Sequence, residues 1–327
     1  MEYTSLGRSG LKVSRLCLGT MSFGNYNDER ESFRIMDAAL DAGINFFDTA
    51  DNYGKSTNHE GITETIIGKW FAQGGGRRER VVLGTKVFEE MHDPNDGPNS
   101  QAGLSAYKIR RHLESSLKRL QTDHVELYYM HHIDRNVSWE ELWGSFEILV
   151  QQGKIDYVGS SNFAGWHLAD AQAEAKARHF MGLICEEHKY NLMCRLPELE
   201  LLPSAKEHGI GVVAYAPLQH GQLSRNALKV MDDKRLNSMS PAIQKHRIQL
   251  EAFRKLCLEL GEHEDNVALA WVLANPSVTA PIIGISSVEH LQDALRSLEI
   301  VLTQDIMKKL DEIFPGPGGI APEAYAW

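Results

Sequence analysis

The chain has few cysteines and no long apolar stretch. Its four cysteines, Cys17, Cys185, Cys194 and Cys257, lie far apart and form no CxxC pair, which argues against a zinc site or a disulfide framework. No apolar run approaches the roughly 18 residues of a membrane-spanning helix, and the N-terminus MEYTSLGRSG lacks the features of a secretory signal. We therefore expect a cytoplasmic protein with reduced cysteines and no membrane partner.

The sequence is also short of positive charge and of metal-binding patterns. It carries 34 Lys and Arg against 44 Asp and Glu, a formal net charge of −10, which argues against a nucleic-acid partner. It has no HExxH motif and no carboxylate cluster, so we expect no metal. Residues 209–214, GIGVVA, resemble a dinucleotide fingerprint, but they lead into a predicted strand instead of following one, so we give them no weight.

What is present is the composition of a soluble globular protein, with 43% apolar and 24% charged residues in a chain of 327. Short apolar runs, each followed by a segment with helical periodicity, recur at intervals of roughly 30 to 40 residues. This pattern is typical of a parallel sheet with helices outside. Eight such repeats predict one TIM-type (β/α)8 barrel domain spanning residues 1–327, with an open doubly wound sheet as the alternative. The predicted strands are residues 16–20, 44–47, 81–87, 125–134, 154–163, 182–190, 210–216 and 280–285.

Other segments lie outside these repeats. Residues 1–15 alternate apolar and polar positions around Gly7 and Gly10, which predicts a hairpin covering one end of the fold. Residues 89–103 after the third strand and 217–245 after the seventh are too long for simple connections, and loops of that length usually carry function. An extra helix over residues 303–314 precedes a Gly- and Pro-rich tail, PGPGGIAPEAYAW.

Polar side chains stand where three predicted strands end. In GINFFDTADNYG, residues 43–54, Asp48 follows the apolar run and Tyr53 comes five residues later; Lys86 lies near the end of VVLGTKV, and His131 follows LYYM. The strand ends of a barrel share one rim, so these four side chains would meet there. Taken singly, Asp at such a place commonly caps a turn and Tyr commonly packs, so the prediction depends on their convergence.

Together these residues form a proton-transfer set. A free tyrosine has a pKa of about 10. We expect Lys86 to favour the phenolate and Asp48 to hold that lysine in place and charged. Tyr53 would then protonate a carbonyl oxygen oriented by a neutral His131, while a bound nicotinamide supplies hydride.

The motifs around these residues, INFFDTADNYG, VVLGTKV, LYYMHHID and VGSSNF, resemble those of the aldo-keto reductases and occur in the family's order. The resemblance runs from LGRSGLKVSRLCLGTMSFG to PIIGISSVEHLQDAL, nearly the whole chain, within the branch that includes potassium-channel β-subunits and many bacterial reductases. It implies that Asp48, Tyr53, Lys86 and His131 are the catalytic residues. His131 is chosen over His132 because the family's aspartate, here Asp134, lies three residues on.

The same resemblance implies an NADPH cofactor, with NADH as the alternative, extended across the barrel mouth. Three departures leave the NADP or NAD preference open: Glu187 replaces the usual Gln, Ala294 replaces an Asn, and Ser286 and His290 stand where NADPH-selective members often have Arg or Lys. The implied cofactor-binding residues are Gly19, Thr20, Met21, Asp48, Ser161, Asn162, Glu187, Tyr215, Pro217, Leu218, Gly221, Leu223, Gly284, Ser286, His290 and Asp293.

Phe23, Phe88 and His132 are expected to wall the substrate pocket. We predict an NAD(P)H-dependent reductase of small aldehydes or ketones, and the tail resembles that of reductases of actinomycete-type secondary metabolism, some of which act on keto-sugars. A sugar or alcohol dehydrogenase would use the same residues in reverse. A third hypothesis is a regulatory subunit that binds the cofactor but has little turnover. The sequence does not indicate an oligomeric state.

Overall fold

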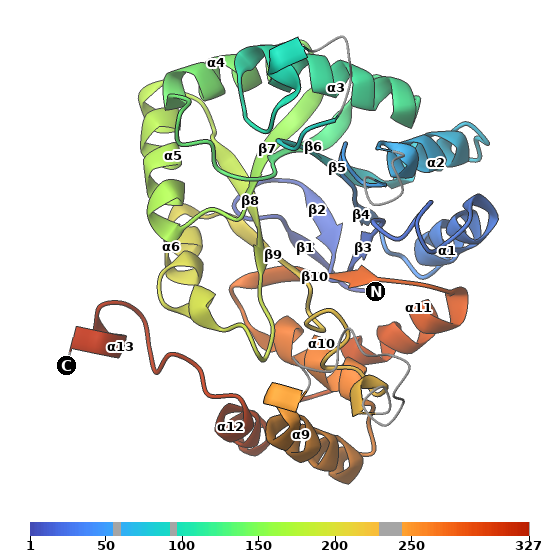
Figure 1. The fold of residues 1–327 in the computed structure, drawn as a ribbon, viewed down its shortest axis with the longest axis vertical. Helices are drawn as coiled ribbons and strands as arrows, with labels where there is room; N and C mark the ends of the chain where they lie inside the picture. The colour runs from blue at the N-terminus through green and yellow to red at the C-terminus, as the bar shows by residue number, and fades with distance from the viewer. Residues whose placement is uncertain (55–59, 92–96, 229–243, 327) are drawn as a thin grey trace.

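The computed structural model, which describes residues 1–54, 60–91, 97–228 and 244–326, contains eight parallel strands that close into a barrel in the order β10-β3-β4-β5-β6-β7-β8-β9. Figure 1 shows the helices surrounding these strands. The predicted (β/α)8 fold is therefore confirmed. The barrel strands are β3 (Cys17–Gly19), β4 (Phe46–Asp48), β5 (Val82–Val87), β6 (Val125–Met130), β7 (Ile155–Ser161), β8 (Leu183–Lys189), β9 (Gly211–Tyr215) and β10 (Val278–Gly284). The described helices are α1 (Glu29–Asp41), α2 (Ile62–Phe71), α3 (Ala106–Leu120), α4 (Trp139–Gln151), α5 (Gly165–Ala177), α6 (Leu201–His208), α9 (Arg247–Leu260), α10 (Glu264–Ala274), α11 (Val288–Leu295), α12 (Gln304–Ile313) and α13 (Glu323–Ala326).

The predicted hairpin is formed by β1 (Tyr3–Ser5) and β2 (Lys12–Ser14), and it covers the end of the barrel at which the strands begin. Leu6 and Val13 are buried in the apolar cluster that fills the barrel interior. The turn needs glycine, because Gly7 has a φ of +57° and a Cβ there would lie 2.5 Å from the Gly209 carbonyl oxygen. With this end covered, the opposite rim is the one where side chains can meet ligands.

A second and larger apolar cluster fills the space between the strands and the helices. Helix α3 shows why its sequence folds as it does: Ile109, Leu113 and Leu117 recur at helical spacing and are buried. The helix begins after Ser105, whose Oγ accepts a hydrogen bond of 3.2 Å from the Lys108 backbone N–H.

The barrel closes where its first and last strands pair. Residues 282–284 of β10 lie in register with residues 17–19 of β3. Arg15, just before β3, donates to the carbonyl oxygens of Val278 and Thr279 at 3.0 Å each and of Leu273 at 2.7 Å. The two ends of the chain, separated by 263 positions at the Val278 contact, are thus joined along one seam.

The structure corrects several predicted boundaries. β4 begins and ends later than expected, so Asp48 belongs to the strand itself. β6 ends at Met130, which leaves His131 just beyond the strand. The tail contains a single helical turn, α13, that its Gly and Pro content did not predict. Within the two predicted long loops, residues 92–96 and 229–243 lie outside the described residues.

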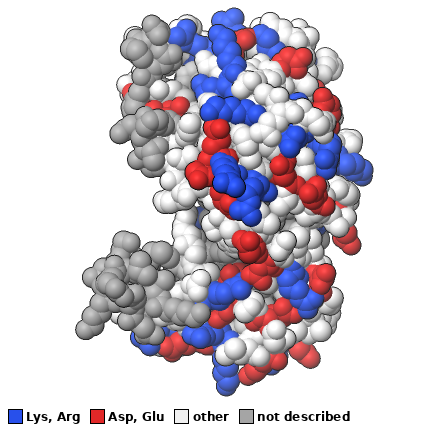
Figure 2. Space-filling view, turned by 90° about the vertical axis from the view of Figure 1, so that its right-hand side faces the viewer, with Lys and Arg blue, Asp and Glu red and all other residues white. Residues whose placement is uncertain are grey.

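The outer helices carry charges of both signs. On the face in Figure 2, blue and red side chains are interspersed over the described residues. On helices α1 and α2, Lys69 lies 2.5 Å from Glu29, and Arg34 lies 2.6 Å from Glu31. Such exposed ion pairs contribute little to stability.

Candidate active site

Lys86 is the centre of the polar group at the rim. β4 and β5 are neighbours in the barrel, and their ends bring Asp48 and Lys86 together. The Lys86 Nζ donates to both carboxylate oxygens of Asp48 at 2.6 Å, to the Thr49 carbonyl oxygen at 3.0 Å and to the Tyr53 Oη at 3.1 Å. The ammonium is completely buried. A buried charge needs such partners, so the cluster holds Lys86 in one place.

The turn after β4 aims Tyr53 at this ammonium. The Tyr53 N–H donates to the Ala50 carbonyl oxygen at 3.3 Å, and the Tyr53 carbonyl oxygen accepts from the Gly61 N–H at 3.1 Å. The ring of Tyr53 meets that of His131 edge-on, with centroids 6.3 Å apart. Asp48, Tyr53, Lys86 and His131 therefore converge, as the sequence predicted for these four residues.

Lys86 favours the Tyr53 phenolate, as expected, but burial has a larger and opposite effect that the sequence did not show. Burial raises the pKa of Tyr53 well above its usual value, and the opposing effect of Lys86 is smaller. Lys86 itself stays protonated: burial lowers its pKa, but the neighbouring acidic groups, the Asp48 carboxylate first among them, outweigh that effect and raise the pKa well above its usual value. Tyr53 is thus a neutral phenol beside a fixed cation, not a phenolate.

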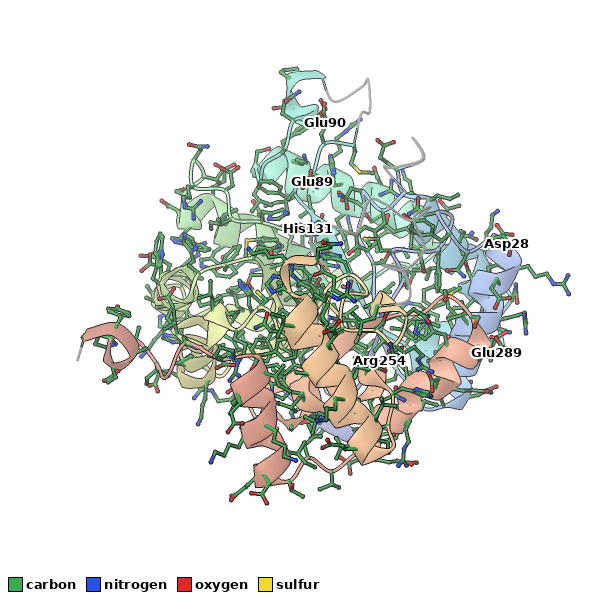
Figure 3. The ribbon with its side chains drawn as sticks, turned by 60° about the horizontal axis from the view of Figure 1, so that its bottom comes forward. Asp28, Glu89, Glu90, His131, Arg254 and Glu289 are labelled. Atoms are coloured by element: carbon green, nitrogen blue, oxygen red, sulfur yellow. The ribbon has the colours of Figure 1, made fainter. Side chains whose placement is uncertain are left out.

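His131 is held as a neutral imidazole. Burial lowers its pKa well below the usual value, and the neighbouring Lys86 adds to the effect. Its ring stacks on that of His132 at 5.2 Å with an interplanar angle of 14°, and its carbonyl oxygen accepts from the Asn162 side chain at 3.1 Å. Its buried Nδ1 has no hydrogen-bond partner. Figure 3 places His131 among the side chains at the barrel mouth, close to Glu89.

Glu187 joins the cluster from β8. Its Oε2 lies 3.3 Å from the Lys86 Nζ yet makes no hydrogen bond. Burial and, to a smaller extent, the Asp48 carboxylate raise the pKa of Glu187 to about 8, against the opposing effect of Lys86. At neutral pH the Glu187 side chain therefore keeps its proton and can donate a hydrogen bond, as the Gln of the family pattern would.

Several of the predicted cofactor residues are linked to one another at this rim. Thr20 donates through Oγ1 to the Asp48 carbonyl oxygen at 2.8 Å. Asn162 adopts a φ of +61°, and its side chain donates to Ser161 Oγ at 3.0 Å and accepts from the Tyr215 hydroxyl at 2.8 Å. Residues at the ends of three strands, β3, β7 and β9, are thus fixed relative to the cluster around Lys86.

The remaining predicted cofactor residues lie on two segments that follow β9 and β10. On the first, Pro217 and Leu223 are buried and Leu218 and Gly221 are partly exposed. On the second, Gly284 and Ser286 are exposed, and Ser286 Oγ lies 3.3 Å from His290 Nδ1. A Cβ at Gly284 would meet no atom within 4 Å, so open space lies beside this strand end. Gly19 is buried in β3, and Met21 is 59% exposed.

Arg225 is a residue that the sequence reasoning missed. Its backbone N–H donates to Asp265 Oδ1 at 2.5 Å, its Nε donates to Asp265 Oδ2 at 3.1 Å, and its guanidinium pairs with Asp293. It therefore ties the segment after β9 to helices α10 and α11. In the sequence, Arg225 could have been noticed only as a basic residue two positions after Leu223, which is one of the predicted cofactor residues.

Of the three residues expected to line the substrate pocket, two contact each other near His131. Phe88 and His132 meet edge-on with centroids 5.2 Å apart. Phe23 is completely buried in the larger apolar cluster, so its burial does not support a place in the pocket wall.

The rim offers unsatisfied groups to a ligand. Buried polar atoms without a hydrogen-bond partner include His131 Nδ1, Glu187 Oε2 and Asn52 Oδ1. A bound molecule with its own donors and acceptors would satisfy them. Among the described residues no group of three or more His, Cys, Asp or Glu side chains could hold a metal ion.

The family model described as "Aldo/keto reductase family" matches residues 15–314. The chain belongs to this family, and it is an oxidoreductase of the kind that reduces carbonyl compounds. Across residues 1–54, 60–91, 97–228 and 244–326, none of the helices has the length and hydropathy that a membrane crossing requires.

Three similar proteins show the range of the family's members. An uncharacterized oxidoreductase of Bacillus subtilis, YrpG, is 63% identical over 327 residues, covering 100% of both chains. A probable voltage-gated potassium channel subunit beta of Arabidopsis thaliana is 30% identical and covers 99% of this chain and 100% of its own. Norsolorinic acid reductase A of Aspergillus parasiticus is 31% identical over 94% of this chain and 79% of its own length.

Proposed function

We propose that the protein reduces aldehydes or ketones with NADPH, or with NADH as the alternative, and that Tyr53 is the general acid. The observation that carries this proposal is the hydrogen bond of 3.1 Å between the Lys86 ammonium and the Tyr53 hydroxyl. A raised pKa keeps the phenol protonated before the reaction. Once the proton has left, the phenolate lies against a fixed cation, which stabilises the charge that develops.

The other residues of the cluster have separate roles in this proposal. Asp48 keeps Lys86 in place. The neutral His131 offers a ring nitrogen to the substrate carbonyl and so orients its oxygen toward Tyr53. A nicotinamide cofactor, when bound, supplies the hydride.

We propose that the sixteen cofactor-binding residues named from the sequence hold that nicotinamide dinucleotide. Glu187 lies beside Lys86, and Ser161 and Asn162 are hydrogen-bonded to each other at the rim. The Glu187 Oε2, which has no hydrogen-bond partner, is placed to pair with the carboxamide of the nicotinamide. Ser286, His290 and Asp293 lie by the open end of β10 and are assigned to the adenosine half. Because Ser286 and His290 carry no permanent positive charge, comparison of NADPH and NADH affinities by fluorescence titration is needed to decide between them.

The test is steady-state oxidation of NADPH and NADH with a panel of aldehydes, ketones and keto-sugars. We expect turnover with at least one class, and we expect Tyr53→Phe to lose about 10²-fold or more of kcat while binding the cofactor as before. Tyr128→Phe, a change to a buried tyrosine that donates to the Ile109 carbonyl oxygen away from the site, is the matched control. Unchanged turnover in Tyr53→Phe would remove the proton-donor role.

Oxidation of a sugar or alcohol is the second candidate, and Glu187 is the observation that favours it. An ionisable carboxyl in place of Gln can stabilise the positive charge of an oxidised nicotinamide when the pH is high enough to ionise it. Initial rates measured in both directions at pH 7 and pH 9 separate the two candidates. A protein that binds cofactor but turns over no substrate in either direction would instead resemble a regulatory subunit.

A further inference from the structure

Lys108 is a lysine buried outside the catalytic cluster. It lies in the first turn of α3 and is 1% exposed. Its Nζ donates to four backbone carbonyl oxygens: Glu89 at 2.6 Å, Gln101 at 2.7 Å, Phe88 at 2.8 Å and Ser100 at 3.3 Å. An ammonium has three hydrogens, so three short bonds and one longer, shared contact use its full capacity.

This position is unfavourable for a lysine unless the carbonyl oxygens compensate. The first turn of a helix carries the positive end of the helix dipole, where a cation is disfavoured. Burial adds a desolvation cost for the charge. The carbonyl oxygens around Lys108 supply negative partial charge in return, much as they would around a bound metal cation.

The four carbonyls belong to the two stems of the segment that leaves β5. Phe88 and Glu89 lie on the outgoing stem, and Ser100 and Gln101 on the returning one. Two further contacts join the same stems: the Gly103 N–H donates to the Phe88 carbonyl oxygen at 2.9 Å, and the Gln101 side chain donates to Glu90 at 3.4 Å. Lys108 therefore fixes both stems to helix α3.

The outgoing stem in turn supports the catalytic histidine. The Phe88 ring meets the His132 ring edge-on at 5.2 Å, and the His132 ring stacks on that of His131 at 5.2 Å. Glu89 Oε1 also lies 3.7 Å from His132 Nε2. Figure 3 shows Glu89 close to His131, with Glu90 farther from the barrel. A continuous set of contacts thus runs from the Lys108 ammonium to the His131 imidazole.

We propose that Lys108 is a positioning residue for the substrate side of the active site, through the Phe88 and Glu89 backbone and the His132 ring. The proposal rests on the proposed carbonyl reduction. It concerns the substrate half of the site, because the four carbonyl oxygens that Lys108 contacts belong to Phe88, Glu89, Ser100 and Gln101, none of which is assigned to the cofactor. Loss of the ammonium should therefore impair substrate turnover and leave cofactor affinity unchanged.

The test compares Lys108→Ala and Lys108→Met with Lys118→Ala, an exposed lysine on the same helix. Lys108→Met keeps the apolar stem of the side chain if the smaller variant folds poorly. We expect kcat/KM for the carbonyl substrate to fall about 10- to 100-fold in both Lys108 variants. We expect the cofactor Kd to be unchanged, and faster hydrogen exchange at the Gly103 and His131 amides. The control should match the wild type.

Chemical rescue separates the role of the ammonium from simple packing. Methylammonium added to Lys108→Ala can replace the lost N–H donors and should restore part of kcat/KM. Tetramethylammonium carries the same charge but has no N–H donor, and it should not. Wild-type kcat/KM and wild-type amide exchange in both Lys108 variants would overturn the proposal, as would a loss that neither amine restores. If the wild type itself reduces no carbonyl compound, the proposed function fails, whereas unchanged exchange would still count separately against Lys108.

Discussion

Replacement of Glu187 by Gln should change how stability depends on pH. Glu187 is 4% exposed, and its carboxyl lies 3.3 Å from the Lys86 ammonium, which Asp48 also contacts. Burial raises its pKa from 4.5 to about 8. Between those two values the folded chain keeps a proton that the unfolded chain has released, so rising pH favours the unfolded state. The contribution of Glu187 to stability is therefore fully present below pH 4.5 and is lost as the pH rises through about 8.

The size of the effect follows from this interval. Each pH unit in the window lowers the free energy of unfolding by about 1.4 kcal/mol. From pH 6 to pH 9 the wild type should lose about 3 kcal/mol through Glu187 alone, most of it below pH 8, and it should lose little more at higher pH. Gln cannot ionise, so the Glu187→Gln variant should lack this loss.

Urea unfolding at pH 6, 7, 8 and 9 measures the difference between the two proteins, with Glu140→Gln on the exposed side of α4 as a control. The variant should gain about 3 kcal/mol relative to the wild type across this range. In the activity assay, kcat/KM of the wild type should fall above about pH 8, when Glu187 ionises, and the variant should keep its activity to higher pH. Parallel stability curves for the two proteins would refute the reasoning about burial.

Three further changes test other parts of the structure. Lys86→Met should lower stability by about 3–5 kcal/mol, because it leaves a buried carboxylate without its partner, and an unchanged thermal midpoint would contradict this. Gly7→Ala should cost about 1–3 kcal/mol in urea unfolding, since φ is positive and a Cβ would strike a carbonyl oxygen; Gly10→Ala, with no atom within 4 Å of its Cβ, is the control. Asp51 lies in the turn between β4 and Tyr53, and its carboxylate makes a buried contact of 2.9 Å with His112 Nδ1. Asp51→Asn should weaken this contact, disturb the position of Tyr53 and lower kcat more than cofactor affinity; equal losses in both would argue against a role in holding the turn.

Much of the fold and the catalytic cluster could be predicted because the signals are local. Short β-branched runs followed by helical periodicity identify each repeat, and a closed barrel then brings the strand ends to one rim. Asp48, Lys86 and His131 could be named from their place at those ends. The boundaries were less accurate: the position of Asp48 within β4 depends on pairing with β3 and β5, which the local pattern does not contain.

What the sequence could not show has one physical cause, which is that burial depends on the whole fold. Lys86 favours the Tyr53 phenolate as expected, but desolvation of the hydroxyl is the larger effect. Phe23 follows a strand end and was predicted to wall the pocket, and the sequence could not show that it is completely buried in the larger apolar cluster. Lys108 would be read as a surface residue in the first turn of a polar helix, because the carbonyls that surround it are seven to twenty positions away.

The seam between β3 and β10 has a consequence for how the protein is made. During synthesis β3 emerges early, but its partner strand follows only after some 260 further residues. At ribosomal rates of about 5–20 residues per second, one edge of the growing sheet stays unpaired for a time on the order of tens of seconds. Every nascent chain must therefore protect an open sheet edge from aggregation until its last strand arrives.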